Sequence, residues 1–170
     1  MTKLFLITLL IVRHLSYGQS NYPTKSQLIK ALTKETNVKK KSYKSTNWFT
    51  FESDSSYKTA DTVTFFNNYK YHYGKKNCNL IYWSFFKMDA FYLQEVTCKE
   101  PANASEADGS NVFTYEISNN QNQMVFQVFN KMKLVEKFEV LSLTKKILHS
   151  ESKEMVNVLT LRRIKNDELD

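Results

Sequence analysis

The chain has few of the residues on which recognisable catalytic and cofactor motifs depend: of 170 residues, three are glycine, three are histidine and two are cysteine. It contains no dinucleotide fingerprint, no Walker loop and no G-x-S-x-G elbow. The histidines and cysteines show no zinc-ligand spacing. The sequence therefore predicts no cofactor, no metal site and no enzyme. A hydrolase assembled from scattered residues stays open as an alternative, which a perturbed carboxylate or His72 in a cleft would support.

Long apolar runs are also scarce, and the longest lies at residues 4–12 (LFLITLLIV). It is too short for a membrane anchor, which needs about 20 apolar residues. Lys3 precedes it, and Ser16 and Gly18 supply the small residues of a cleavage site. We expect residues 1–18 to be a signal peptide cleaved near Gly18, and the protein to be secreted or periplasmic.

The composition favours a single β-rich domain. Hydrophobic residues make up 42% of the chain and charged residues 24%, which argues against both a disordered chain and a membrane bundle. Aromatic residues reach 14%, a load that suits β-sheet. A chain of this length forms one domain.

The basic charges are dispersed rather than gathered. The formal net charge is +7, and lysines stand in small groups at 39–41, 75–76 and 145–146. Lysine lacks the bidentate fork with which arginine binds phosphates, so no nucleic-acid partner is expected. A lysine-rich surface suits solvent, peripheral contact with an anionic membrane surface, or an acidic protein partner.

A short helix is expected in the N-terminal segment 19–36. Leu28, Ile29 and Leu32 fall on one face at helical spacing, and Ser26 can cap the helix. Such a helix would act as a lid or plug on the main domain.

From residue 37 onward, strand-like alternation replaces helical spacing. Many short strands without helices between them are typical of an antiparallel sandwich or an up-and-down barrel, and the succession of hairpins favours the barrel. We expect the barrel to span 37–164 and a tail to follow at 165–170. The expected strands are 37–43, 46–52, 62–66, 69–73, 79–86, 90–97, 111–118, 123–130, 137–144, 146–150 and 155–164.

Two of the expected hairpins carry a register prediction. Asn67 and Asn68 tolerate positive φ, so a two-residue turn there would pair Phe66 with Tyr69. The second hairpin is centred on Met88 and joins the strands 79–86 and 90–97.

The second hairpin places Cys78 directly opposite Cys98. In an oxidising compartment we expect a disulfide between them, worth about 3 kcal/mol. The alternative is two reduced thiols that merely end their strands. A C-x-x-C redox site is excluded by the spacing.

Residues 99–110 (KEPANASEADGS) form a long acidic link. Links of this length are either disordered or functional, and both alternatives stay open. Asn103 begins a formal glycosylation sequon, which we expect to be accidental.

Three segments carry a resemblance to a known family: 61–73 (DTVTFFNNYKYHY), 138–150 (FEVLSLTKKILHS) and 156–164 (VNVLTLRRI). Together with the leading QLIKALTKET they resemble the bacterial secreted lipocalin-like domain. The resemblance covers about 27–164 and implies an antiparallel up-and-down β-barrel with a short N-terminal helix. The interior of such a barrel either holds one small ligand or is filled by side chains.

The aromatic residues are the candidates for a binding site. On the hairpin around Met88 the more apolar face carries Ile81, Trp83, Phe85, Phe91, Leu93 and Glu95, and we assign it to the interior. If a cavity exists, the sequence predicts Trp83, Phe91 and Leu93 in its wall, with Tyr71 and Phe126 at its mouth.

These observations predict a monomeric, secreted, lipocalin-like binding protein for a small hydrophobic ligand. The alternative is an extracellular protein-interaction module of the inhibitor or immunity type, whose barrel is filled by side chains. A filled barrel favours the second function and an open barrel favours the first.

Overall fold

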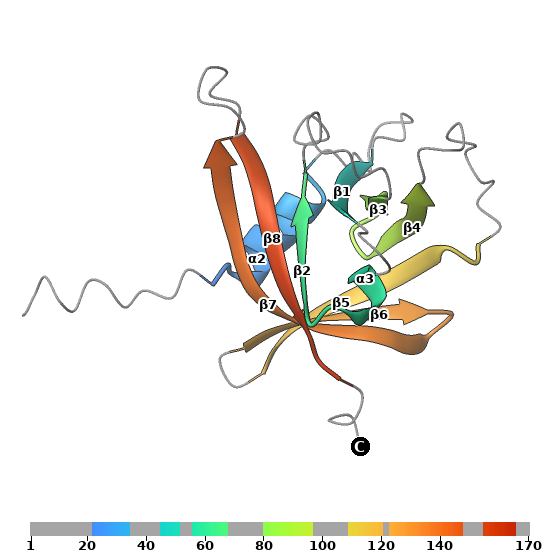
Figure 1. Cartoon of the computed structure of the whole chain (residues 1–170). Helices are drawn as coiled ribbons and strands as arrows, with labels where there is room; N and C mark the ends of the chain where they lie inside the picture. Colours follow the sequence, from blue (N-terminus) through green and yellow to red (C-terminus); the bar gives the residue numbers. More distant parts are fainter. Residues whose placement is uncertain are drawn as a thin grey trace, which may run out of the picture.

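The computed structural model describes residues 22–34, 45–51, 56–67, 80–96, 109–120, 123–147 and 155–165. Within them, eight antiparallel strands close into a barrel, accompanied by two short helices (Figure 1). The predicted all-β antiparallel barrel with a short N-terminal helix is confirmed. The elements are α2 (Lys25–Leu32), β1 (Thr46–Phe51), α3 (Ser56–Thr59), β2 (Thr62–Phe66), β3 (Leu80–Phe85), β4 (Ala90–Val96), β5 (Val112–Asn120), β6 (Gln123–Asn130), β7 (Lys133–Ile147) and β8 (Met155–Arg163).

Strands β3 to β8 follow one another around the barrel, and β1 and β2 complete the circle. β1 lies between β3 and β2, and β2 pairs with β8. Phe66 therefore has a strand partner on each side, Phe49 and Val158. The predicted pairing of Phe66 with Tyr69 is wrong. Barrel closure outweighs the local turn preference, because an unpaired edge on β2 would leave backbone N–H and C=O groups unsatisfied.

The β3–β4 hairpin has the predicted register. Trp83 lies opposite Leu93, and residues 87–89 form the bend between the strands. If it continued beyond the two strands, the same register would set Cys78 opposite Cys98, as the sequence predicts. Both cysteines lie outside the described residues, so their disulfide stays a prediction.

Most of the predicted inward face of this hairpin is buried, but Glu95, assigned to the same face, is exposed. Ile81, Trp83, Phe85 and Phe91 have no exposed surface, and the partly buried Leu93 packs against the same core. Strand alternation delivers one large side chain to the interior at every second residue. In the part of the chain that the structure describes, the largest fully buried side chains are Trp48, Trp83, Phe49, Phe65, Phe85, Phe91, Phe126, Phe138, Leu28, Leu32, Ile81 and Leu159.

Helix α2 packs its apolar face into the barrel core. Leu28 and Leu32 have no exposed surface and belong to the central apolar cluster. The helix is capped by Thr24, whose hydroxyl accepts a hydrogen bond from the N–H of Gln27, while the Gln27 side chain accepts one from the N–H of Thr24. The expectation that Ser26 caps the helix is wrong, because the helix begins at Lys25 and Ser26 lies inside its first turn.

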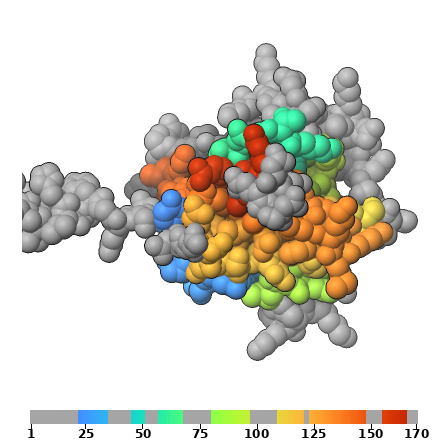
Figure 2. Space-filling model, turned by 90° about the horizontal axis from the view of Figure 1, so that it is seen from below, coloured from blue at the N-terminus to red at the C-terminus, as the bar shows by residue number. Residues whose placement is uncertain are grey.

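Helix α3 lies where β1 ends and β2 begins, and its Tyr57 is buried against Phe65, with ring centroids 6.3 Å apart. In the view of Figure 2, residues of this part of the chain lie next to the last residues of β8. Neither described helix is long and apolar enough to span a membrane.

Candidate functional site

The interior of the barrel is occupied by stacked and tilted aromatic rings around Trp83. The Trp83 ring centroid lies 4.4 Å from that of Phe65, 4.8 Å from Phe91 and 5.5 Å from Phe126. All four side chains have no exposed surface. Centroid separations in this range are direct ring contacts. Around Trp83, the interior of the barrel is therefore filled by side chains.

The structure brings together three of the five residues that the sequence assigned to a ligand site. Trp83, Phe91 and Phe126 form one ring cluster, and Leu93 lies opposite Trp83 at its edge. Tyr71 lies outside the described residues. Phe126 sits in the cluster and not at a mouth, since it has no exposed surface.

A polar cluster closes the barrel beside α3. The guanidinium of Arg163 lies 4.8 Å from the ring centroid of Phe138 and donates from Nη1 to Glu136 Oε1 at 3.0 Å. Nη2 of the same group donates to the backbone carbonyl of Tyr57 at 2.7 Å. The Tyr57 hydroxyl donates to Glu136 Oε2 at 3.0 Å. Arg163 and Glu136 keep 17% and 19% of their side-chain surface exposed, so the pair is largely removed from water.

Burial raises the pKa of Tyr57 well above its ordinary value, and the neighbouring Glu136 carboxylate adds to the rise. The Trp83 indole N–H and the Arg163 charge oppose it. The indole N–H groups of Trp48 and Trp83 nevertheless have no hydrogen-bond partner of good geometry among the described residues. Each such buried donor costs about 1–3 kcal/mol.

On the outside, a shallow groove runs along α2 toward the β3–β4 bend. We call it the basic groove; it has a volume of about 680 Å³ and is lined by Lys25, Ser26, Ile29, Lys30, Thr33, Lys34 and Met88. Its apolar centre is formed by Ile29 and by Met88, whose side chain is 52% exposed. Lys25, Lys30 and Lys34 line the same groove. Among the described residues, no carboxylate forms an ion pair with Lys25, Lys30 or Lys34.

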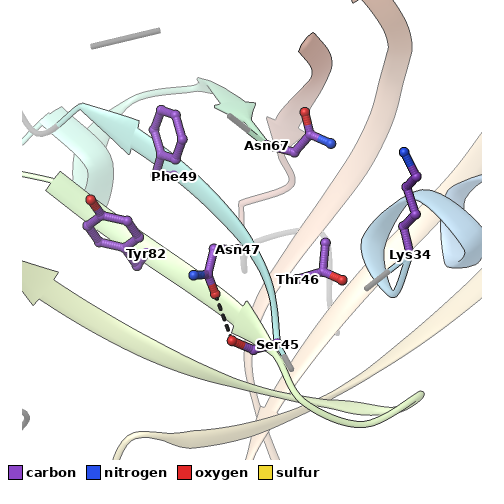
Figure 3. Close-up of a pocket in the computed structure, with 7 residues that line it drawn as sticks. All are labelled: Lys34, Ser45, Thr46, Asn47, Phe49, Asn67 and Tyr82. Atoms are coloured by element: carbon purple, nitrogen blue, oxygen red, sulfur yellow. Dashed lines mark hydrogen bonds between the residues drawn. The ribbon is translucent and has the colours of Figure 1, made fainter. Parts of the chain in front are cut away.

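A second hollow, the seam pocket, lies where β1 and β2 separate. It has a volume of about 420 Å³ and is lined by Lys34, Ser45, Thr46, Asn47, Phe49, Asn67 and Tyr82. In Figure 3, Lys34 and Asn67 lie on one side of it and the rings of Phe49 and Tyr82 on the other. Asn47 stands between these two groups (Figure 3).

A third hollow of about 540 Å³ lies at the end of β8, and its charges are largely compensated. Arg162 pairs with Glu139, and Lys165 pairs with Asp61 at 3.6 Å. None of the three hollows is lined by Trp83, Phe91, Leu93 or Phe126. The described surface sites therefore differ from the site that the sequence predicted.

Sequence reasoning missed both the basic groove and the seam pocket. The groove could have been found from the α2 sequence KSQLIKAL, in which Lys25 and Lys30 stand on either side of the buried Leu28 and no acidic residue occurs. The seam pocket had no local signal, since Lys34, Asn67 and Tyr82 meet only through the strand order.

No metal cluster of three histidine, cysteine, aspartate or glutamate side chains occurs in the described part of the chain. No family model matches the chain, and neither the curated proteins nor the solved structures contain a match.

Proposed function

We propose that the protein is an exported, non-enzymatic interaction module that recognises a protein partner on the outside of a filled barrel. The observation that supports this function is the packing around Trp83, whose ring contacts Phe65 and Phe126. An interior ligand would have to displace rings that already bury each other. Their burial is worth roughly 25 cal/mol for each Å² removed from water. Recognition at the surface avoids this cost.

The basic groove is the surface that we assign to the partner. The ammonium groups of Lys25, Lys30 and Lys34 attract carboxylates, and Ile29 and Met88 offer an apolar contact between them. Methionine adapts its shape to different apolar partners. The chemistry fits an acidic protein segment that carries apolar side chains between its carboxylates.

Binding of a synthetic peptide of repeated Asp-Leu-Glu triplets tests this assignment. We expect saturable binding that weakens as salt rises, because screening acts on exposed charges. The Lys25→Glu, Lys30→Glu double variant should bind about tenfold more weakly or worse. The matched control is Lys145→Glu, Lys146→Glu, which makes the same charge change on exposed residues at the end of β7. Equal losses of peptide affinity in both double variants would show that only the net charge of the protein matters, and would overturn the assignment.

Two further probes address the competing functions. Stoichiometric binding of N-phenyl-1-naphthylamine that oleate displaces, with quenching of tryptophan fluorescence, would replace the proposal with an interior carrier of hydrophobic ligands. Sedimentation with phosphatidylglycerol vesicles, in the absence of peptide binding, would replace the protein partner with a membrane surface. We expect neither result for the wild-type protein.

A further inference from the structure

The seam pocket exists because β2 leaves β1 to follow β8. β1 and β2 share one register pair, Phe49 opposite Phe66, whereas β2 pairs with β8 along its whole length. Just after β2, Asn67 continues along β8: its N–H donates to the carbonyl of Asn157 at 3.2 Å. The first residues of β1 therefore stand apart from Asn67, and the pocket opens between them (Figure 3).

The side-chain amides at this opening present donors. Asn67 Oδ1 accepts a hydrogen bond from the backbone N–H of Asn157 at 2.8 Å, and this partner fixes the amide orientation because an N–H can donate only to the oxygen. Asn67 Nδ2 is thereby left for the pocket. Across the opening, Asn47 Oδ1 accepts from the hydroxyl of Ser45 at 3.0 Å, which leaves Asn47 Nδ2 as a second donor.

The described lining of the pocket carries a positive charge. Among the lining residues that the structure describes, Lys34 has the only full charge and none is aspartate or glutamate. Lys34 follows the C-terminal end of α2, where the helix dipole is equivalent to about half a negative charge. The full positive charge of the Lys34 ammonium is larger than this partial negative charge, so the net charge at the pocket favours an anion.

The opposite wall is aromatic. The rings of Phe49 and Tyr82 lie with centroids 5.9 Å apart, and Tyr82 is partly exposed. The volume of about 420 Å³ lies in the range of small-molecule sites, roughly 300–1,000 Å³. We propose that the seam pocket binds a small organic anion, with its carboxylate or phosphate group at Lys34 and the amide donors and its apolar part against Tyr82.

Titration with benzoate and with phenyl phosphate, followed by amide proton and nitrogen chemical shifts, tests the site. Phenol serves as the neutral counterpart of both probes. We expect saturable shifts at Lys34, Asn47 and the side-chain amide of Asn67 with the anions, and no saturation with phenol. Equal responses to phenol and to the anions would overturn the proposal.

The deciding variant is Asn67→Asp. It keeps the oxygen that accepts from Asn157 and replaces the pocket-facing N–H donor by a negatively charged carboxylate oxygen, so the fold should be retained while anion binding weakens about tenfold or more. Lys34→Gln should weaken binding to a similar extent. Lys58→Gln is the control, because Lys58 is exposed and pairs with Glu95 on another part of the barrel. Unchanged anion affinity in Asn67→Asp, with the native shift pattern preserved, would overturn the site.

This site is independent of the proposed protein partner. Lys34 borders both the seam pocket and the basic groove, but Asn67 lines only the pocket and Lys25 only the groove. Loss of anion binding in Asn67→Asp with retained peptide binding supports the pocket alone. Failure of the peptide to bind would leave the anion test unaffected.

Discussion

Trp83 in β3 and Phe126 in β6 stack across the interior of the barrel, with ring centroids 5.5 Å apart and ring planes at 18°. β4 and β5 separate these strands in the barrel wall, so the contact crosses the interior instead of following the sheet. One ring pair thus ties distant strands together and occupies the space that an interior ligand would need.

Shortening Phe126 should therefore be costly. Phe126 has no exposed surface, and Phe126→Ala is expected to lower the free energy of unfolding by about 3–5 kcal/mol in urea titrations. Met132→Ala is the control, because Met132 is 95% exposed and its loss should change stability by about 0.5 kcal/mol or less. A small effect of Phe126→Ala would mean that the interior is loosely packed and that the filled-barrel argument fails.

The cap of α2 offers a second test. Thr24→Ala removes the hydroxyl that accepts from the N–H of Gln27 and should cost about 0.5–2 kcal/mol. Ser26→Ala should be near neutral or slightly stabilising, because alanine favours the helix interior. Thermal unfolding of both variants decides between the two residues. A larger loss for Ser26→Ala would restore the cap that the sequence alone suggested.

The largely buried ion pair Arg163–Glu136 should contribute more to stability than the exposed pair Lys165–Asp61. Arg163→Met leaves the Glu136 carboxylate largely buried with Tyr57 as its one remaining donor among the described residues, and should cost about 2–4 kcal/mol after allowance for partial exposure. Asp61→Asn removes a pair whose side chains are 72% and 75% exposed, and should cost about 0–1 kcal/mol. Chemical denaturation of the two variants side by side measures the difference. Similar costs would contradict the structural role of the Arg163 cluster.

Alkaline pH should destabilise the protein through Tyr115. Burial, and then the nearby Asp89 charge, raise its pKa far above the ordinary value of 10.0, and its hydroxyl donates to the carbonyl of Met88 at 2.6 Å. Below about pH 10 the folded and unfolded states both keep the proton. Above it the unfolded state loses the proton first, so stability falls as pH rises toward the folded-state pKa.

The measurement is the urea midpoint at about pH 9 and about pH 11 for the wild type and for Tyr115→Phe. The variant loses the hydrogen bond to Met88 and should be less stable at the lower pH. Its further loss at the higher pH should be smaller than that of the wild type. An identical pH response in both proteins would show that Tyr115 ionises equally easily in the folded and unfolded states.

The sequence was sufficient wherever the decisive interaction is local or periodic. Strand alternation predicted the buried face with Trp83, and a three-residue bend predicted the register in which Trp83 lies opposite Leu93. The sequence was not sufficient where contacts between segments far apart in the chain determine which strands pair. Phe66 takes Val158 as a partner because the barrel must close, and Asn67 reaches the seam pocket for the same reason.

The same register leads to the last prediction, a disulfide between Cys78 and Cys98. The β3–β4 ladder runs without a shift up to the pair Leu80–Val96. If the same register continued for two more positions on each strand, it would bring the two cysteines opposite each other. Mass spectrometry of the protein, purified under non-reducing conditions, should show a loss of two hydrogens. Reduction should lower the free energy of unfolding by about 3 kcal/mol. A fully reduced mass would instead mean that the ladder ends or shifts before the cysteines, and that the hairpin is held by its aromatic face alone.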